Sequence, residues 1–355
     1  MSEETKEATP KDKDHGVLYV GMDLGTSRTS VSASNGVRET VLSVVGYPKD
    51  VVSAKLLKKD VLFGKEAIEK RLSLRFLRPL EKGRLKYSQA DASVEEENIK
   101  AAKDLIREAV RLARPRKDEL VYCVIGVPAQ ASIKNKATII DVAREAVDSV
   151  MLCSEPFAVA YGLDMLDDVL VIDIGAGTTD LCRMHGTMPE DADQVTYNIA
   201  GDAVDEELTR LILAEHPEAQ FSKEMVKDIK ERYSYLGEAS ERAVVQVPIK
   251  GKPTAIDVTE LVKKACGILV PPIVEGINKL VSTFDPEFQH KLRNRVLLAG
   301  GGSMIKNLDS AIEAAMLRDL GGGRVRRAEE PIYGGANGAL KIAHDMPEDY
   351  WEKLR

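Results

Sequence analysis

The stretch VLVIDIGAGTTDLC, residues 169–182, joins an apolar run to a loop of small residues. The apolar part favours a buried strand, and the glycines that follow mark its end. Acids stand on both sides of the loop, Asp173 at the end of the strand and Asp180 after the threonines. Nearly the same design occurs in YVGMDLGTSRTSVSAS, residues 19–34, with Asp23 in the corresponding place. This repetition predicts a duplicated fold whose two halves face each other.

Both loops have the chemistry of a phosphate cradle. A glycine-rich hairpin directs several backbone N–H groups to one point, and glycine permits the close approach of an oxygen. Threonine and serine hydroxyls add donors, while an acid at the strand end suits Mg²⁺ held through water. A single loop of this kind would fit a β-turn that merely needs glycine. Two loops, with a third glycine loop in LLAGGGSMI (297–305), instead predict two clamps on one polyphosphate chain.

These considerations define the candidate nucleotide-binding and metal-binding residues. They are Asp23, Leu24, Gly25, Thr26 and Ser27 in the first loop, Gly175, Ala176, Gly177, Thr178 and Thr179 in the second, and Gly300, Gly301, Gly302 and Ser303 in the third. Asp23 and Asp173 are the candidates for organising Mg²⁺, through water rather than by direct ligation.

Composition excludes several other classes of protein. The net charge of −7 over 355 residues argues against a sequence-independent nucleic-acid binder, which needs a basic surface. Four widely spaced cysteines without a CxxC pair favour small buried side chains in a reducing compartment. No run of about 18 apolar residues is evident, so no transmembrane segment is expected. The polar residues 1–15 are expected to form a disordered tail on a cytoplasmic protein.

Strands alternate with helices along the chain, which indicates an α/β fold. The main helices are expected at 98–113, 202–215 and 223–236, with a strand pair within 243–258 and a long helix over 259–283 interrupted by Pro271 and Pro272. The expected division is a tail (1–15), a first lobe (16–168 with 334–355, and a small subdomain at about 48–90), and a second lobe (169–333, with a small subdomain at about 202–270).

With these loops in this order, the sequence resembles the actin/Hsp70/sugar-kinase ATPase superfamily. The two phosphate loops match GMDLGTSRTS and VIDIGAGTTD, and an adenosine loop matches LLAGGGSMI. Connecting motifs match residues 125–146, 154–162 and 334–343. The resemblance implies an actin-like ATPase fold of two duplicated ribonuclease-H-like lobes, each with a small inserted subdomain. It also implies that ATP and Mg²⁺ bind in the cleft between the lobes.

Within that superfamily, the chain is most similar to the bacterial actins associated with magnetosomes. FGKEAIEKRLSLRFLRPLEKGRL (63–85) and VKDIKERYSYLG (226–237) resemble actin itself, while SEPFAVAYG (154–162) resembles the rod-shape actins. The resemblance implies a cytoskeletal ATPase that polymerises with ATP and disassembles after hydrolysis. Its partners would be further copies of itself and adaptor proteins on magnetosomes or other cargo. Alternatives are a rod-shape or plasmid-segregation actin, an Hsp70-like monomeric regulator, and a small-molecule kinase.

The resemblance also assigns roles to single residues. Glu155 would position or activate the hydrolytic water, and Asp173 would organise its surroundings. The remaining nucleotide contacts carried over are Gly201, Asp202, Lys230 and Glu231. A helix-dipole role for Glu155 and a solvated helix face for the Lys230–Glu231 pair remain alternatives. Arg28 departs from the pattern of most relatives, and whether it reaches a phosphate is left open.

Overall fold

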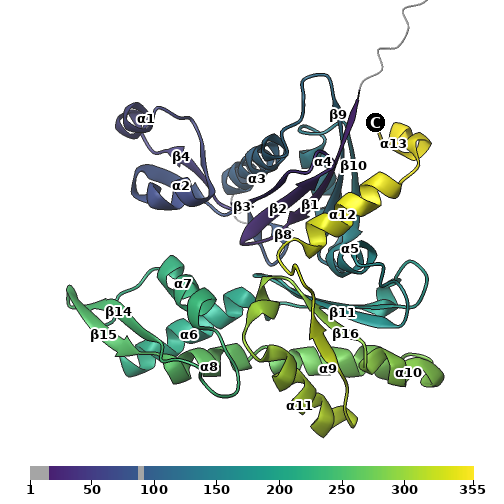
Figure 1. The fold of residues 1–355 in the computed structure, drawn as a ribbon. Coiled ribbons are helices and arrows are strands. Elements are labelled where there is room, and N and C mark those ends of the chain that lie inside the picture. Colours follow the sequence, from purple (N-terminus) through teal and green to yellow (C-terminus); the bar gives the residue numbers. More distant parts are fainter. Residues whose placement is uncertain (1–15, 87–91) are drawn as a thin grey trace, which may run out of the picture.

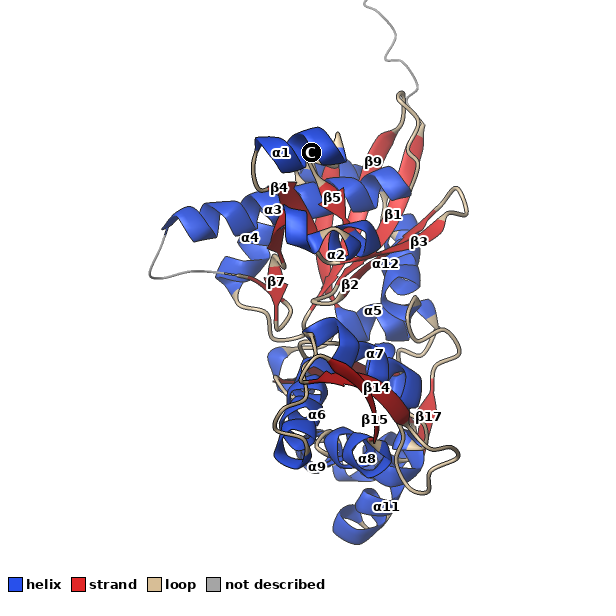
Figure 2. Ribbon diagram, turned by 90° about the vertical axis from the view of Figure 1, so that its left-hand side faces the viewer, coloured by secondary structure: helices blue, strands red, loops and turns tan. Residues whose placement is uncertain are grey.

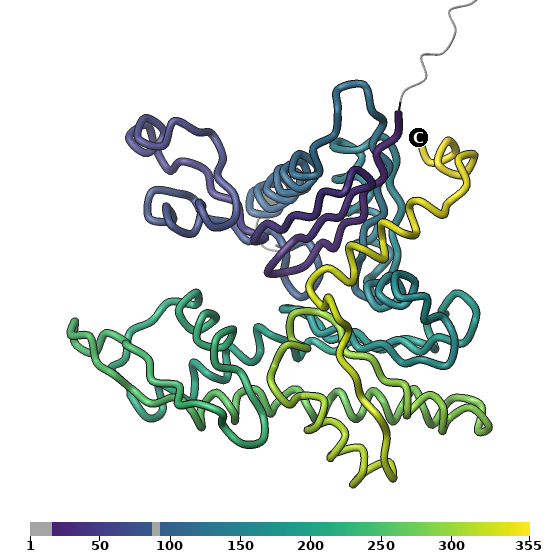
Figure 3. The backbone as a smooth tube through the Cα atoms, viewed as in Figure 1, coloured from purple at the N-terminus to yellow at the C-terminus, as the bar shows by residue number. Residues whose placement is uncertain are grey.

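The computed structural model describes residues 16–86 and 92–355 (Figure 1). The expected tail at 1–15 and the end of the expected subdomain at 87–90 lie outside these residues. The described chain forms two halves, one above the other in Figure 1, each built around a five-stranded sheet. The tube in Figure 3 shows the chain entering the second half and returning to the first near its C-terminus.

The first sheet has the strand order β10-β9-β1-β2-β3. β1, β2 and β3 form an antiparallel meander, and β9 and β10 run parallel to β1. A turn at Asn35-Gly36, with Gly36 at a φ of 85°, joins β2 to β3. The strands are β1 (Val17–Leu24), β2 (Arg28–Ala33), β3 (Arg38–Leu42), β9 (Leu120–Val127) and β10 (Ser149–Ser154).

The second sheet has the same arrangement as the first. Its strand order is β17-β16-β11-β12-β13, in which β17, β16, β11, β12 and β13 correspond to β10, β9, β1, β2 and β3. β11 and β12 pair antiparallel, β12 and β13 likewise, while β16 and β17 run parallel to β11. The same topology in both halves is what a duplicated sequence pattern requires. The strands are β11 (Val169–Ile174), β12 (Thr179–Met184), β13 (Gln194–Tyr197), β16 (Val296–Ala299) and β17 (Val325–Arg327).

Two helices lie between the sheets and join the halves. α12 (Gly334–Asp345) packs on β1, β9 and β2, and α5 (Glu155–Gly162) packs on β11 and β12. The two helices also pack on each other, and Figure 2 shows α5 at the level where the halves meet. α13 (Glu348–Leu354), which was not expected, places Trp351 in the core against Tyr122. The C-terminal segment therefore completes the first half.

Further helices cover the outer faces of the sheets. On the first half, α3 (Ala92–Leu112) and α4 (Ile133–Ala143) contact each other, and the buried side chains of α3 pack in the same core as those of β1 and β9. On the second half, the corresponding helices are α9 (Val270–Ser282), α10 (Pro286–Arg293) and α11 (Leu308–Leu320). Each half thus has its own apolar core, centred on its sheet.

Each half carries a smaller insertion. The first has a three-stranded sheet, β5-β4-β6, over a core of its own, and its helices project away from the main sheet in Figure 1. Its elements are β4 (Val45–Pro48), α1 (Val51–Leu57), β5 (Leu62–Phe63), α2 (Gly64–Glu69), η1 (Arg71–Ser73) and β6 (Leu74–Leu77), followed by the short hairpin β7 (Leu80–Glu81) and β8 (Arg84–Leu85). The second has α6 (Gly201–Glu215), α7 (Lys223–Tyr233), β14 (Val244–Ile249), β15 (Lys252–Asp257) and α8 (Thr259–Gly267).

The long helix expected over 259–283 is divided in two. α8 ends at Gly267 and α9 begins at Val270, with Pro271 and Pro272 in its first turn, where a missing N–H costs nothing. By length and hydropathy alone, Thr259–Ser282 could cross a membrane, contrary to the expectation that no such run exists. In the structure 56% of its most apolar window is buried, and its side chains pack in the core of the second half.

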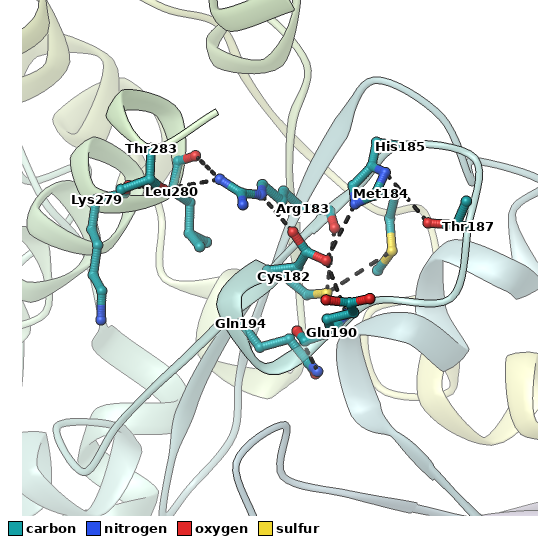
Figure 4. Close-up of polar contacts among 11 residues, drawn as sticks. Cys182, Arg183, Met184, His185, Thr187, Glu190, Gln194, Lys279, Leu280 and Thr283 are labelled. Atoms are coloured by element: carbon teal, nitrogen blue, oxygen red, sulfur yellow. Dashed lines mark hydrogen bonds and ion pairs between the residues drawn. The ribbon is translucent and has the colours of Figure 1, made fainter. Parts of the chain in front are cut away.

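A buried ionic network fastens β12 to α9 (Figure 4). Arg183 donates from Nε to Asp193 at 2.7 Å, and from Nη1 to the Leu280 carbonyl at 2.8 Å. Burial alone would raise the pKa of Asp193, but donation from the Glu190 N–H, Arg183 and His185 outweighs it and lowers that pKa. The network holds the edge of the second sheet against its covering helix, away from the phosphate loops.

Candidate functional site

A cavity of about 530 Å³ lies between the two halves. It is where the phosphate loops predicted from the sequence meet. A second cavity of similar size, between α10 and α11, has none of these loops in its wall. The first is lined by Asp23, Gly25, Thr26, Ser27, Arg28, Ser30, Gly83, Glu155, Asp173, Gly175, Ala176, Gly177, Thr178, Gly201, Asp202, Val204, Lys227, Lys230, Glu231, Ser234, Leu269, Gly300, Gly301, Gly302, Met304, Ile305, Lys306, Pro331 and Ile332.

All but three of the residues predicted for the site line this cavity. The exceptions, Leu24, Thr179 and Ser303, lie behind its wall. Leu24 is buried in the core of the first half. Thr179 donates its hydroxyl to the Ile199 carbonyl at 2.8 Å, and Ser303 donates its hydroxyl to the Gly300 carbonyl at 2.7 Å. Both hydroxyls therefore shape loops instead of facing the cavity.

Three acids gather in the wall of the cavity, each at the end of a structural element. Asp23 stands near the end of β1, Asp173 near the end of β11, and Glu155 in the first turn of α5. Burial raises the pKa of Asp23 to about 6. Burial, and then the charges of Asp23 and Asp180, raise the pKa of Glu155 and of Asp173 well above their ordinary values. Such a cluster attracts a cation.

These acids fit a magnesium ion held through water. No group of three His, Cys, Asp or Glu side chains among the described residues is arranged to hold a metal ion directly. Mg²⁺ commonly keeps several waters and touches few protein oxygens, so the absence of a direct cage does not conflict with the prediction. Asp23 and Asp173 come from opposite halves, and both line the cavity beside the phosphate loops.

The two phosphate loops approach each other closely. A Cβ atom on Gly177 would lie 2.5 Å from the Thr26 hydroxyl and 2.6 Å from the Lys82 Cα atom, so no larger residue fits there without movement. Thr26 in turn accepts a hydrogen bond from the Gly83 N–H at 2.8 Å. The turn between β7 and β8 therefore covers the loops. Gly83 was not predicted as a site residue, because the sequence of a short hairpin does not indicate where that hairpin lies in the fold.

The third glycine loop packs against the second acid. Gly300 has a φ of 73°, and a Cβ atom there would lie 2.3 Å from Asp173 Oδ1. A Cβ atom on Gly302 would lie 2.3 Å from the Ile174 side chain. Glycine is therefore required for this loop to pass beside β11, and the glycines of 300–302 leave backbone alone facing the cavity.

Helix α7 brings positive charge to the cavity. Lys227 donates to the Ser27 hydroxyl of the first phosphate loop at 2.5 Å, although burial lowers the pKa of its ammonium group. Lys230 instead pairs with Asp205 at 2.9 Å, and Glu231 lies 3.8 Å from Lys227. Arg28 lines the same cavity. Lys227 was missed, although its spacing of three residues from Lys230 puts both on one helix face.

Comparison with known proteins agrees with this architecture. A family model described as MreB/Mbl protein matches residues 18–349. The actin-like protein MamK of Paramagnetospirillum magneticum (strain AMB-1) is 41% identical over 337 residues, which is 95% of each chain. The structure of a MamK double helical filament, 41% identical, has a TM-score of 0.88 and covers 94% of this chain and 100% of that chain.

A second solved structure bears on the ligand. A non-polymerising MamK mutant bound to AMPPNP, also 41% identical, has a TM-score of 0.69 and covers 93% of this chain and 100% of that chain. The duplicated sheets and the extent of these matches confirm the actin-like fold expected from the two repeated loops. The chain belongs to the MreB/Mbl family of actin-like proteins.

Proposed function

We propose that this chain is a cytoskeletal ATPase that assembles into filaments with ATP, disassembles after hydrolysis, and positions magnetosomes in a bacterial cell. The observation that carries the proposal is the cavity, where two sheets of the same topology bring together paired glycine loops and two acids, with a third acid supplied by α5. Similarity to MamK over nearly the whole chain supports the filament and the magnetosome role. We further propose a cytoplasmic location and adaptor proteins on the cargo.

In the proposed site, ATP lies across the cavity with its phosphates between residues 24–27 and 175–179. The backbone amides of both loops donate to the phosphate oxygens, with donors contributed by both halves. Mg²⁺, when bound near Asp23 and Asp173, supplies positive charge that stabilises both the phosphate oxygens and the ionised acids. The nucleoside is held by Gly201, Asp202, Lys230, Glu231 and the loop at 300–302.

Hydrolysis requires a water molecule in line with the terminal phosphate. We assign its orientation to Glu155, which stands at the first turn of α5 between the halves. The ionised carboxylate accepts a hydrogen bond from this water, and Asp173 orders the groups around it. Because Asp173 lies on the second sheet and Glu155 on the helix between the two sheets, a change in how the halves sit alters the spacing of these acids. Assembly that favours one arrangement would therefore speed hydrolysis.

A filament needs a contact that does not close into a ring. Exposed apolar side chains suited to such a contact lie on the first insertion, and we call Val51, Val52, Leu56 and Leu72 the apolar tip. All four are more than two-thirds exposed, and Lys49 joins their segments by donating to the Leu72 carbonyl. We propose that this tip contacts the next subunit, giving a heterologous, open-ended assembly.

High-speed sedimentation with and without ATP and Mg²⁺ tests the proposal, with phosphate release measured on the same samples. We expect the protein to enter the pellet with ATP and to release phosphate while it is assembled. Electron micrographs of the pellet should show filaments. ATP hydrolysis by protein that stays in the supernatant would favour the alternative of an Hsp70-like monomeric regulator. The absence of binding to any purine triphosphate would contradict the whole proposal.

A further inference from the structure

One loop of the first half is fastened to the edge of the second sheet. The loop follows β9, and its Gln130 side chain pairs with β13 as a neighbouring strand would. Gln130 Oε1 accepts from the Thr196 N–H at 3.2 Å, and Gln130 Nε2 donates to the Gln194 carbonyl at 3.1 Å. The Gln130 N–H also donates to the Thr196 hydroxyl at 3.2 Å. β13 is the outermost strand of its sheet, so its polar edge is open to such a contact.

The same loop holds a buried acid. The Ala129 N–H donates to Asp180 Oδ1 at 2.9 Å, and the Thr196 hydroxyl donates to the same oxygen at 2.5 Å. Asp180 is fully buried, and its Oδ2 atom has no hydrogen-bond partner among the described residues. Buried polar atoms are rarely left without partners unless a water, ion or function accounts for them. Asp180 is thus held through Oδ1 by the Ala129 N–H of the other half and by the Thr196 hydroxyl of its own half.

Asp180 lies next to the acids of the cavity. It is directly opposite Asp173 in the pairing of β11 with β12, so the two side chains stand on the same face of the sheet. Its charge contributes to the raised pKa values of both Glu155 and Asp173. A displacement of Asp180 would therefore change the electrostatic surroundings of the residues to which we assign the hydrolytic water.

We propose that Gln130 is a positioning residue of the ATPase site. By fastening the loop after β9 to β13, it fixes Ala129 against Asp180 and so couples the arrangement of the two halves to the acid cluster. This inference rests on the proposed ATPase function. Gln130 is itself exposed and its three hydrogen bonds lie at the edge of the sheet, so this contact can be removed without disturbing the core.

Loss of the Gln130 side chain should affect the rate of hydrolysis more than the affinity for the nucleotide. Gln130 touches no residue that lines the cavity through its side chain, so its loss should not weaken nucleotide binding much. It should slow the chemical step, because small misplacements of reacting groups cost large factors in rate. Since its effect passes through Asp180, changes at the two residues should not be additive.

The experiment compares Gln130→Ala, Asp180→Asn and the double variant with the parent chain. Gln246→Ala, an exposed glutamine on β14, is the matched control. We expect Gln130→Ala to slow phosphate release about tenfold at saturating ATP while changing the Kd for ATP less than about threefold. The double variant should be about as slow as the slower single variant. Additive losses, or an unchanged rate for Gln130→Ala, would overturn the proposal.

A measurement independent of ATP separates this inference from the proposed function. Hydrogen exchange of the nucleotide-free protein should become faster in both segments 128–131 and 194–197 in Gln130→Ala, and in neither segment in the control. Unchanged exchange would overturn the fastening even if the protein is an ATPase. If Asp180→Asn does not fold, Thr196→Val replaces it in the cycle, because it removes the hydroxyl that donates to Asp180.

Discussion

Gly338 of α12 lies so close to Ala158 of α5 that a Cβ atom on Gly338 would stand 1.7 Å from the Ala158 carbonyl oxygen. Gly162, one turn further along α5, faces the same residue, because its Cβ atom would lie 2.9 Å from the Gly338 Cα atom. Backbone therefore meets backbone where the two halves join. Because α5 begins at Glu155, this contact sets the position of the proposed catalytic carboxylate relative to the first half.

Gly338→Ala should force the two helices apart. Overpacking of this kind typically costs about 1–3 kcal/mol, and the backbone atoms involved cannot rotate away. We expect a lower free energy of unfolding in urea and slower phosphate release. Gly267→Ala is the matched control, since Gly267 is a helical glycine with open space around its Cβ position. There alanine should stabilise the protein by up to about 1 kcal/mol. Equal stability of the two variants would contradict the tight crossing.

The sequence predicted the duplicated sheets and most of the cavity wall because the signals are local. An apolar strand, an acid and a glycine loop are adjacent in residues 169–182, and the same order recurs at 19–34. Their meeting in one cavity follows once two such units face each other. The close packing of α9 on the second sheet could not be predicted. At Gly276 of α9, a Cβ atom would clash with Leu181 and Tyr197 of that sheet. Nothing near Gly276 in the sequence reports that contact.

Contacts between the halves could not be predicted in the same way. Gln130 and Thr196 are ordinary polar residues in sequence, and their pairing depends on the distance between a loop and a strand edge. Lys227 reaches Ser27 only because α7 leans over the cavity. The division of the helix over 259–283 was foreseen at Pro271 and Pro272, but the break falls just before them, since proline is accepted in a first turn.

Arg183→Met should destabilise the second half strongly. It would leave Asp193 buried without its main cationic partner, and breaking a buried pair in this way costs about 3–5 kcal/mol. Urea unfolding followed by circular dichroism measures the loss. Arg210→Met is the control, because the Arg210–Glu207 pair is exposed and should contribute nothing measurable. Similar losses of free energy of unfolding in both variants would show that the network of Figure 4 does not stabilise the second half.

Asp23→Asn should change how stability depends on pH in the nucleotide-free protein. Burial raises the pKa of Asp23 from 3.8 to about 6, so folding favours its protonated form. The stability contributed by this group is complete below about pH 4 and lost as the pH rises through about 6. That difference in pKa corresponds to about 3 kcal/mol. We therefore expect the free energy of unfolding of Asp23→Asn, measured in urea, to rise relative to that of the parent chain between pH 4 and pH 7.5. Parallel pH profiles would contradict the raised pKa of this acid.

Leu72→Glu should reduce assembly without affecting the fold. Leu72 is 85% exposed on the apolar tip, so its replacement removes no core contact but places a charge in the proposed subunit contact. We expect sedimentation with ATP to fall and the unfolding midpoint to stay the same. Met188→Glu, on an exposed methionine of the second half, is the control for added charge. Normal pelleting of Leu72→Glu would remove the tip from the filament contact.

Glu155→Gln separates assembly from hydrolysis. Glutamine keeps the size of the side chain but cannot accept a proton, so water near the terminal phosphate loses its base while the phosphate loops are untouched. General-base catalysis contributes about 10²–10⁴-fold, so phosphate release should fall by at least about a hundredfold. Because neutral glutamine also removes one charge from a crowded acid cluster, ATP should bind as well as to the parent or better. Filaments of the variant should therefore form normally and persist after dilution. If they released phosphate as fast as the parent, Glu155 would act only on the helix dipole of α5, and the hydrolytic water would have to be oriented by Asp173.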